Sequence, residues 1–328
     1  MLNRNILICG ATGFIGKNML EYFGKDKHNN IIAIYNRTPP FETSHLNAKI
    51  KWIKADLCSA SEVEKIMINV DYVIQAAATT SGAKDIISSP YIHVTDNAIM
   101  NSLLLREAFE NKIKHFIFFS CTVMYQSSND AVLESDYNPN VPIYEKYFGV
   151  GNTKIYIENM LEFFSNISNM KTTAIRHSNV YGPYDKFDFD KSHVFGATVS
   201  KVMTSDKKIS VWGNGEEERD LLHVNDLCEF VNKVLKNQKK KNRIYNCGLG
   251  EKISIKELVN LIISKSGKNI SIDFDTSKPT IKTSLFLNCN LAYNELNWKP
   301  SINLESGVEK VIDWWKKNID KKTLKVKV

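Results

Sequence analysis

The stretch Ile6-Leu7-Ile8-Cys9-Gly10-Ala11-Thr12-Gly13-Phe14-Ile15-Gly16 decides the fold of this chain. Its first four residues are apolar and predict a buried strand, and a helix is predicted to follow at about 15–24. The glycines have the spacing G-x-x-G-x-x-G, which permits a tight turn, close approach of the backbone to a pyrophosphate and close packing of helix on strand. Because N–H groups and the helix dipole at a helix N-terminus attract phosphate charge, this stretch predicts a dinucleotide-binding turn.

The pattern of strand and helix continues outward from this turn. Short β-branched runs alternate with helix-length amphipathic segments as far as about residue 180, which is typical of a parallel sheet covered on both faces. The expected strands are Ile6–Cys9, Ile31–Tyr35, Ile50–Ile53, Tyr72–Gln75, His115–Phe119 and Thr173–Arg176. The expected helices lie near 15–24, 61–68, 91–112 and 150–166.

After about residue 180 turn-forming residues become frequent, as in Trp212-Gly213-Asn214-Gly215. Short helices are expected near 225–237, 254–266 and 304–317. The chain is therefore predicted to be an α/β protein with a Rossmann-type doubly wound parallel sheet and a smaller C-terminal α/β lobe. We expect two domains, a dinucleotide-binding domain of residues 1–180 plus about 220–248 and a substrate lobe of residues 181–219 and 249–328.

The composition indicates a folded globular protein, since 43% of the 328 residues are hydrophobic and 24% are charged. The net charge of +7 could suggest a nucleic-acid partner. Much of the excess lies in two short Lys-rich runs, 239–241 and 316–327, which we interpret as solvated surface. We therefore expect no nucleic-acid partner, and the basic balance favours an anionic small ligand such as a nucleotide diphosphate.

The cysteines and the apolar runs predict the compartment. The six cysteines are widely spaced and include no C-x-x-C pair, so neither a disulfide framework nor a metal site is expected. The apolar run Ile6–Cys9 is too short for a signal sequence, and no stretch approaches about eighteen consecutive apolar residues. We expect a cytoplasmic protein without a membrane segment.

The end of the second expected strand, Ala33-Ile34-Tyr35-Asn36-Arg37-Thr38, should meet the adenosine ribose of a bound dinucleotide. NAD sites usually offer a carboxylate to the ribose 2′-hydroxyl, whereas an Arg accommodates the 2′-phosphate of NADP. Because no acid stands here and Asn36 is followed by Arg37, the sequence favours NADP(H) over NAD(H). The alternative is that Arg37 is only a solvent-facing residue at the end of the strand.

Longer motifs accompany the glycine turn, namely Ala55–Leu57, Ala76–Ala78, Asn97, Arg176–Pro183 and Arg219–Leu227. Together they resemble the extended short-chain dehydrogenase/reductases that act on nucleotide sugars, the NAD-dependent epimerase/dehydratase family. Within it the chain most resembles the GDP-L-fucose synthases, through Ala76–Gly82, Gly182–Phe187, Ser192–Val194 and Val211–Gly215. The resemblance covers nearly the whole chain. It implies an NAD(P)-dependent oxidoreductase or epimerase acting at C4, and also at C3 or C5, of a nucleoside-diphosphate sugar in deoxysugar or surface-glycan precursor synthesis.

The resemblance also implies which residues bind the ligands. Those expected to bind the cofactor are Gly10, Thr12, Gly13, Phe14, Ile15, Gly16, Asn36, Arg37, Asp56, Leu57, Ala76, Ala77, Ala78, Asn97 and Lys154. Those expected to bind the nucleoside-diphosphate sugar are Asn179, His193, Val194, Lys201, Trp212 and Arg219. An Arg suits planar, bidentate recognition of a diphosphate, although a surface salt bridge with Glu216, Glu217 or Glu218 is the alternative for Arg219.

The family's catalytic dyad, a Tyr and a Lys four residues on, is incomplete in this chain. In the family the Lys holds the nicotinamide ribose and lowers the pKa of the Tyr, which exchanges a proton with the sugar. Lys154 matches the Lys, but Val150 stands where the Tyr is expected. Tyr147 lies about 10 Å before Lys154 along a helix, too far for a direct pair. An irregular helix start at Gly149 and Gly151 would let Tyr147 fold back as the acid/base, and otherwise it lines the pocket.

Two further positions carry open alternatives. Cys121 stands where the family usually has a Ser or Thr that hydrogen-bonds the reacting oxygen. Thr122 could supply that hydroxyl, Cys121 could be an acid/base itself, or Cys121 could be a small apolar residue. The epimerisation Cys of the GDP-L-fucose synthases falls at Val123, so that role is in doubt. His193 matches the family's second epimerisation acid/base, with a structural histidine as the alternative.

Two rival functions stay open at this point. A sugar 4,6-dehydratase usually has an Asp-Glu pair where Val123-Met124 stands, which ranks it lower. A dinucleotide-binding regulator without catalysis would explain Val150, but it would not need the retained Lys154, His193 and Arg219.

The family resemblance also predicts a homodimer. In the family two helices, which correspond here to those near 91–112 and 150–166, pack against the same pair from a second subunit. On the first helix we expect Ile99 to face the sheet and Met100 and Phe109 to fall off that stripe. The second helix has more apolar residues than one face needs, and such surplus tends to mark a subunit contact.

Overall fold

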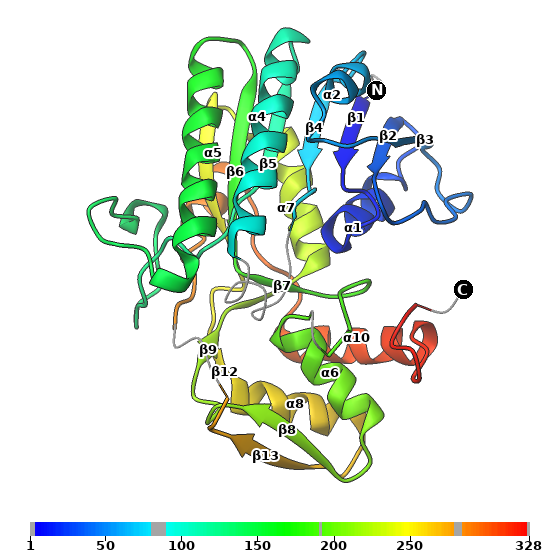
Figure 1. Ribbon diagram of the computed structural model, residues 1–328, viewed down its shortest axis with the longest axis vertical. Coiled ribbons are helices and arrows are strands. Elements are labelled where there is room, and N and C mark those ends of the chain that lie inside the picture. Colours follow the sequence, from blue (N-terminus) through cyan, green and yellow to red (C-terminus); the bar gives the residue numbers. More distant parts are fainter. Residues whose placement is uncertain (1–3, 80–89, 190–191, 279–283, 327–328) are drawn as a thin grey trace.

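Seven parallel strands form one sheet in the upper half of the molecule (Figure 1). This computed structural model describes residues 4–79, 90–189, 192–278 and 284–326. The strand order is β3-β2-β1-β4-β5-β6-β11, so the order reverses between β1 and β4, where doubly wound sheets bind ligands. The strands are β1 Arg4–Cys9, β2 Asn29–Tyr35, β3 Lys49–Lys54, β4 Tyr72–Gln75, β5 His115–Phe119, β6 Lys171–His177 and β11 Asn242–Cys247. The predicted Rossmann-type sheet is confirmed.

β11 is the strand of this sheet that the sequence did not predict. It lies at an edge of the sheet and pairs with β6, and its sequence mixes polar and apolar residues. Asn246 is fully buried there, where its amide group donates to the carbonyl oxygen of Val132 at 2.8 Å and accepts from the Tyr125 hydroxyl at 2.8 Å. Because hydrogen bonds satisfy these polar groups, β11 does not need the apolar run by which strands are recognised.

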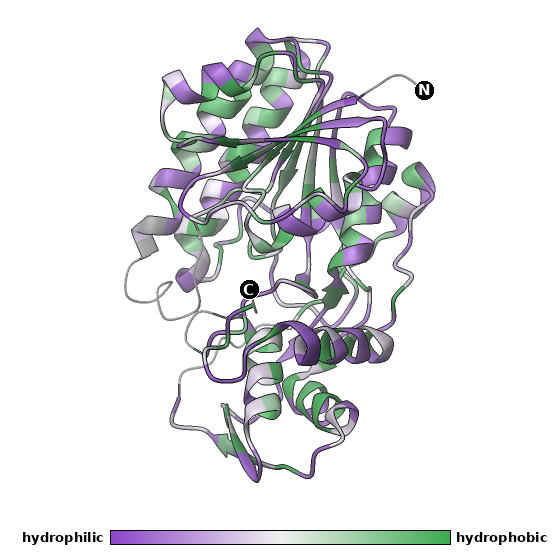
Figure 2. Cartoon of the chain, turned by 90° about the vertical axis from the view of Figure 1, so that its right-hand side faces the viewer, coloured by the Kyte–Doolittle hydropathy of each residue, from purple (hydrophilic) through white to green (hydrophobic). Residues whose placement is uncertain are grey.

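Two layers of helices cover the sheet (Figure 2). Apolar residues of the strands pack against both layers. One face is covered by α1 Phe14–Phe23, α7 Val224–Asn237 and α9 Asn290–Leu296. The opposite face is covered by α2 Ala60–Ile66, α4 Thr95–Glu110 and α5 Phe148–Asn166. Three short 3-10 turns are Pro90–His93, Glu134–Asp136 and Glu145–Tyr147. The first and third directly precede α4 and α5.

The prediction for the faces of α4 was wrong at two residues. Met100 is 6% exposed and packs in the core, whereas Ile99 is 42% exposed. The buried stripe of α4 includes the polar residues Asn97 and Asn101, whose amides are hydrogen-bonded inside the protein. Apolar periodicity alone therefore assigned the wrong phase to this helix.

The lower half of Figure 1 is a smaller α/β lobe. It contains β7 Asn179–Tyr181, α6 Val194–Thr204, β8 Lys208–Trp212, β9 Glu218–Arg219, β10 Leu221–His223, β12 Ile253–Ser254, α8 Ile255–Ser266, β13 Ser271–Asp275 and α10 Leu304–Asn318. Its own apolar core includes Phe195, Leu258 and Trp315. α9 and Trp298 instead pack into the core of the sheet. The proposed division of the chain into 1–180 with 220–248 and the remainder stays a prediction.

The first turn of α1 contacts the smaller lobe directly. The Lys17 ammonium lies 4.0 Å from the ring centres of both Phe41 and Tyr184. The Asn18 amide donates to the carbonyl oxygen of Pro183 at 2.9 Å. The helix that begins at the glycine turn is therefore fixed against the segment that follows β7.

Candidate active site

The glycine turn has the geometry that a pyrophosphate site requires. Gly10 has φ +68°, which L-residues rarely adopt, and a Cβ there would lie 2.7 Å from the Cα of Ala77. A Cβ on Gly16 would lie 2.1 Å from the carbonyl oxygen of Gly10. Both positions therefore need glycine, one for the turn between strand and helix and one for the close packing of α1 on that turn.

The N-terminus of α1 is open to an anionic group. Gly13 is the N-cap residue and supplies no side-chain acceptor to the first turn of the helix. Gly13 itself is exposed, and its N–H donates to the carbonyl oxygen of Gly10 at 2.9 Å. The N–H groups that follow, in Phe14, Ile15 and Gly16, are those that a helix start offers to phosphate. The turn thus fits the pyrophosphate of a dinucleotide.

The other predicted cofactor residues follow the carboxyl ends of neighbouring strands. Asn36 and Arg37 come directly after β2 and are exposed. Asp56 and Leu57 follow β3, where the Asp56 carboxylate accepts from the backbone N–H of Cys58 at 3.0 Å and Leu57 is buried. Thr12 is half-buried in the glycine turn.

The loop after β4 is held in place by Asn97. The Asn97 amide donates to the carbonyl oxygen of Thr79 at 2.9 Å and accepts from the Thr79 N–H at 3.0 Å. Ala76 and Ala77 are partly buried and Ala78 is exposed, so the loop lies at the surface beside the glycine turn. The Asn97 side chain therefore holds the loop after β4 in position. The motif residues 80–82 lie outside the described residues.

Lys154 lies on α5 above the carboxyl end of β5. Its ammonium donates to the carbonyl oxygen of Phe119 at 2.7 Å and lies 4.4 Å from the ring centre of Phe118. Burial lowers the pKa of Lys154. Burial raises the pKa of the Cys121 thiol, and the charge of Lys154 acts in the opposite direction. Lys154 and Cys121 therefore share one partly buried site at the edge of the sheet.

Tyr147 interacts electrostatically with Cys121 and Arg219. It is the residue before α5, and burial raises its pKa while the charge of Arg219 opposes this rise. The thiol of Cys121 also acts on it. Electrostatic interactions thus link Lys154 with Cys121 and Tyr147 with both Cys121 and Arg219, and half-buried Thr122 follows Cys121.

The expected irregular helix start is not found at the two glycines of α5. Gly149 and Gly151 lie inside the helix and neither has a positive φ. A Cβ on Gly149 would lie 2.9 Å from Val94, and a Cβ on Gly151 would lie 2.9 Å from Ile143. These glycines therefore allow close packing of α5 against Val94 and Ile143. Tyr147 is the last residue of the 3-10 turn that precedes the helix, so it does not take the position of Val150.

A buried polar network of Ser120, Glu158 and Arg176 lies next to this site. The Glu158 and Arg176 side chains are each 3% exposed and form an ion pair at 2.7 Å. Ser120 donates to Glu158 at 2.6 Å, and Arg176 donates to the Tyr125 hydroxyl at 2.9 Å. The partners of Glu158 were not identified from the sequence. The available signal for this pair was that Glu158 and Arg176 are charged residues within largely apolar segments, since a buried charge needs a partner.

His193 and Lys201 lie on α6 of the smaller lobe. His193 is the N-cap residue of α6 and keeps contact with solvent, yet the surrounding protein atoms lower its pKa, and the charge of Lys186 adds to this. Val194 follows it as the first residue of the helix. The Lys201 ammonium donates to the carbonyl oxygen of Ser210 at 2.8 Å, so Lys201 lies against β8.

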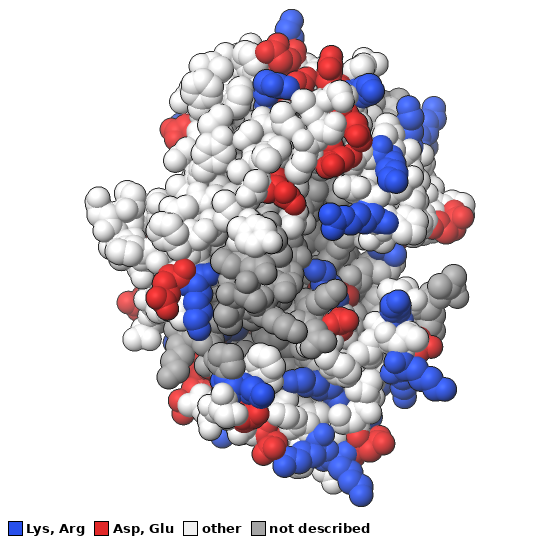
Figure 3. All heavy atoms as spheres, viewed as in Figure 1, with Lys and Arg blue, Asp and Glu red and all other residues white. Residues whose placement is uncertain are grey.

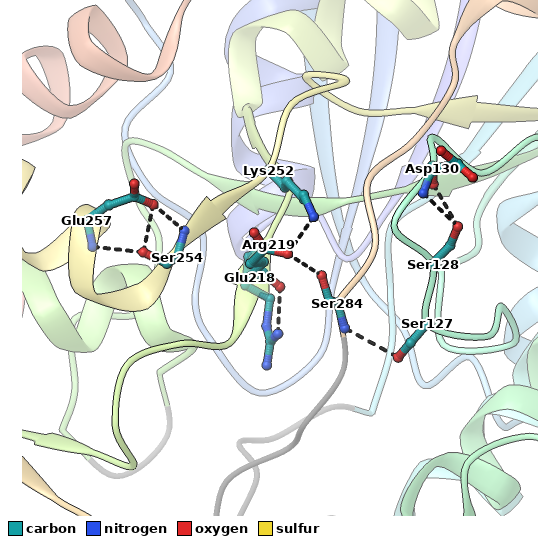
Figure 4. Close-up of polar contacts among 9 residues, drawn as sticks. All are labelled: Ser127, Ser128, Asp130, Glu218, Arg219, Lys252, Ser254, Glu257 and Ser284. Carbon is teal, nitrogen blue, oxygen red and sulfur yellow. Dashed lines mark hydrogen bonds and ion pairs between the residues drawn. The ribbon is translucent and has the colours of Figure 1, made fainter.

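Arg219 projects from β9 of the same lobe (Figure 4). It donates to the carbonyl oxygen of Glu218 at 2.7 Å, and its side chain extends away from Lys252. The Glu218 carboxylate binds Lys252 at 2.7 Å and Ser284 at 2.6 Å. Trp212 is 50% exposed at the end of β8. Exposed Asn179 begins β7, next to β10.

The comparison with protein families decides the identity of this site. The model of the NAD dependent epimerase/dehydratase family matches residues 6–248. The chain belongs to this family. The match spans the sheet from the glycine turn to the end of β11 and confirms the resemblance inferred from the motifs.

Members of the epimerase/dehydratase family align with nearly the whole chain. A GDP-L-colitose synthase from Yersinia pseudotuberculosis is 26% identical over 316 residues, which cover 94% of this chain and 97% of that protein. A GDP-L-fucose synthase from Sinorhizobium fredii is 29% identical over 282 residues, which cover 81% of this chain and 86% of that protein. The solved structure of a UDP-glucose 4-epimerase from Thermotoga maritima has a TM-score of 0.82 at 23% identity, covering 95% of this chain and 99% of that one. This last likeness shows the fold alone.

Family membership makes the chain an NAD(P)-dependent enzyme of the extended short-chain dehydrogenase/reductase type. Its relatives are nucleotide-sugar epimerases and reductases. The six cysteines are all free thiols. Among the helices of the described ranges, none is both long enough and apolar enough to cross a bilayer.

Proposed function

We propose that this enzyme transfers hydride at C4 of a nucleoside-diphosphate sugar, with proton exchange at C3 or C5, as an epimerase or reductase of deoxysugar or surface-glycan precursor synthesis. One observation carries the proposal. Lys154 donates to the carbonyl oxygen of Phe119 at the carboxyl edge of the sheet and its charge acts on Cys121, while the charge of Arg219 from the smaller lobe acts on Tyr147. A cofactor side and a substrate side thus meet at one group of ionisable residues.

On the cofactor side, Gly10–Gly16 would hold the pyrophosphate and Lys154 the nicotinamide ribose. A nicotinamide dinucleotide supplies a two-electron hydride donor or acceptor when bound. The loop Ala76–Ala78, held by Asn97, would bound the cofactor on its other side. We propose NADP(H) over NAD(H), since exposed Arg37 stands at the end of β2 without a neighbouring acid in the strand end.

On the substrate side, Arg219 and Lys201 would bind the diphosphate, and Trp212 and Asn179 would contact the rest of the nucleotide sugar. The planar guanidinium of Arg219 suits two phosphate oxygens. Burial lowers the pKa of both Arg219 and Lys201, and a bound diphosphate would stabilise the charged forms of both side chains. His193, with Val194 behind it, would exchange the proton at a carbon next to the ketone.

We also propose that the enzyme is a homodimer through α4 and α5. The surface over these two helices is largely free of charged side chains (Figure 3). Ile99, Tyr156 and Phe163 are 42%, 43% and 52% exposed there. Apolar area of this kind on two long neighbouring helices favours a two-fold contact.

A substrate panel tests the proposed function. The purified chain is incubated with NADPH or NADP⁺ and with GDP-, UDP-, CDP- and dTDP-linked sugars and their 4-keto forms, and the products are analysed by mass spectrometry. Turnover of one class of nucleotide sugar is expected, and it would name the base and the sugar. Tight cofactor binding without turnover of any of these sugars would instead favour a regulator without catalysis.

A further inference from the structure

His177 is the last residue of β6 and lies in the site beside Lys154. Its ring packs against the ring of Phe119, with 6.2 Å between the centres. Phe119 is the last residue of the neighbouring strand β5, and its carbonyl oxygen holds the Lys154 ammonium at 2.7 Å. The imidazole at the end of β6 and the Lys154 ammonium, which is bound at the end of the adjacent strand β5, therefore lie at the same carboxyl edge of the sheet.

The orientation and the tautomer of the His177 ring are fixed by the backbone. Nδ1 lies 2.8 Å from the carbonyl oxygen of Ser178. Because a carbonyl oxygen can only accept, Nδ1 must carry the hydrogen. Nε2 then has its lone pair free, and within the described part of the chain no residue hydrogen-bonds to it. The residue is only partly buried, so the site around it is open in part to a ligand.

The surroundings keep this ring neutral. Burial lowers the pKa of His177 to about 4, and the charges of Lys154 on α5 and His193 on α6 act in the same direction. The hydrogen bond to Ser178 opposes them. At neutral pH the free enzyme therefore presents a proton acceptor at Nε2, and the arrival of an anionic nucleotide sugar would raise its basicity.

We infer that Nε2 of His177 exchanges the proton with the reacting sugar oxygen, in place of the Tyr that the family has at the position of Val150. This inference rests on the proposed function. In the oxidation direction the O–H bond of the sugar hydroxyl breaks and its proton passes to Nε2. The hydrogen on the same carbon leaves with two electrons to the oxidised nicotinamide cofactor, and a C=O bond forms. In the reduction direction the imidazolium returns the proton to the oxygen.

The test compares His177→Asn with the wild-type enzyme. The Asn amide can still donate to the Ser178 carbonyl from near the position of Nδ1, but it has no atom at the position of Nε2. We expect kcat to fall about 100-fold or more, the range for loss of a general acid–base. The KM for the sugar and the dissociation constant of NADPH should stay within about twofold. His45→Asn, at an exposed position, removes an imidazole elsewhere and should leave all three constants unchanged.

A second measurement does not depend on turnover. NMR of the His177 Cε1–H group should show a shift when the nucleotide sugar is added to the cofactor complex, because the sugar oxygen meets Nε2. If His177→Asn does not fold, His177→Gln is measured with the same criteria. A kcat within about fivefold of wild type, a loss of NADPH binding parallel to kcat, or an unmoved Cε1–H signal would overturn the role of His177.

The two proposals fail in different ways. If the wild-type enzyme turns over no nucleotide sugar, the proposed function falls, and the role of His177 falls with it. If the wild type is active and the His177→Asn variant is equally active, only the role of His177 falls.

Discussion

Asp185→Asn should make the protein more stable at pH 8 and remove part of its pH-dependent stability. Asp185 is 8% exposed, and its Oδ1 accepts from the backbone N–H of Lys186 at 2.7 Å. Oδ2 is buried, and no residue of the described chain hydrogen-bonds to it. Burial raises the pKa of this carboxyl from 3.8 to about 7, and the N–H and charge of Lys186 oppose the rise only in part. The ionised form is therefore costly in the folded state.

The sign follows from the two protonation states. Between about pH 4 and pH 7 the unfolded carboxyl is ionised while the folded one keeps its proton. Because the folded state binds more protons, stability falls as the pH rises through this window, by up to about 1.4 kcal/mol per pH unit. Over the rise from 3.8 to about 7 this amounts to about 4 kcal/mol. Below and above the window Asp185 contributes no slope.

Urea unfolding of wild type and Asp185→Asn, followed by fluorescence from pH 4.5 to 8.5, measures this contribution. The difference in the free energy of unfolding, variant minus wild type, should rise with pH and level off near pH 8. Asp313→Asn, at an exposed position of α10, controls for the loss of one negative charge. A difference for Asp185→Asn that stays constant within about 1 kcal/mol over the range would refute the argument, because it would mean that Oδ2 is solvated.

Four other perturbations test separate parts of the molecule. Lys154→Ala should abolish turnover and weaken NADPH binding in a fluorescence titration, because the ammonium would hold the cofactor ribose, and full activity would remove the proposed mechanism. Arg37→Ala should reduce the preference for NADP(H) over NAD(H) in steady-state rates, whereas a wild type that prefers NAD(H) with no change in the variant would make Arg37 a surface residue. Phe163→Glu should halve the mass seen by light scattering, while exposed Ile68→Glu should not, and a wild-type mass near 37.4 kDa would reject the dimer. Glu158→Ala should lower the free energy of unfolding by about 3–5 kcal/mol in urea, because its arginine partner stays buried without a counter-ion, and a loss below about 1 kcal/mol would contradict this.

Most strands of the sheet were predictable because both of their faces are covered. Short, largely apolar runs such as Ile6–Cys9 and His115–Phe119 are typical of strands buried in this way. β11 escaped because its polar side chains are satisfied by hydrogen bonds from distant segments. The short strands of the smaller lobe, such as β9 and β12, have two residues each and no periodicity to detect. Their pairing is decided by tertiary contacts rather than by local sequence.

The candidate site was predictable where a backbone constraint fixes the residue type. Gly10 and Gly16 cannot be replaced without strain or collision, so the turn can be recognised from spacing alone. The network around Glu158 could not be recognised, since Arg176 joins Glu158 to Tyr125 and Asn246 only through the packing of α5, β6 and β11. Polar networks of this kind join residues by position in space and leave no regular spacing in the chain.

Val150 stands where the family resemblance predicts a Tyr, and the candidate site keeps other ionisable groups. The neighbouring elements carry ionisable groups to the same edge independently, with Cys121 after β5, His177 at the end of β6 and His193 before α6. Each acts on, or is acted on by, its neighbours through charge, as the pKa of His177 is lowered by both Lys154 and His193. In a parallel sheet the carboxyl ends of neighbouring strands lie at the same edge, whichever residues the helix above that edge carries. A proton-exchange group can therefore be supplied from β6 when α5 no longer provides one, while Lys154 keeps its place over β5.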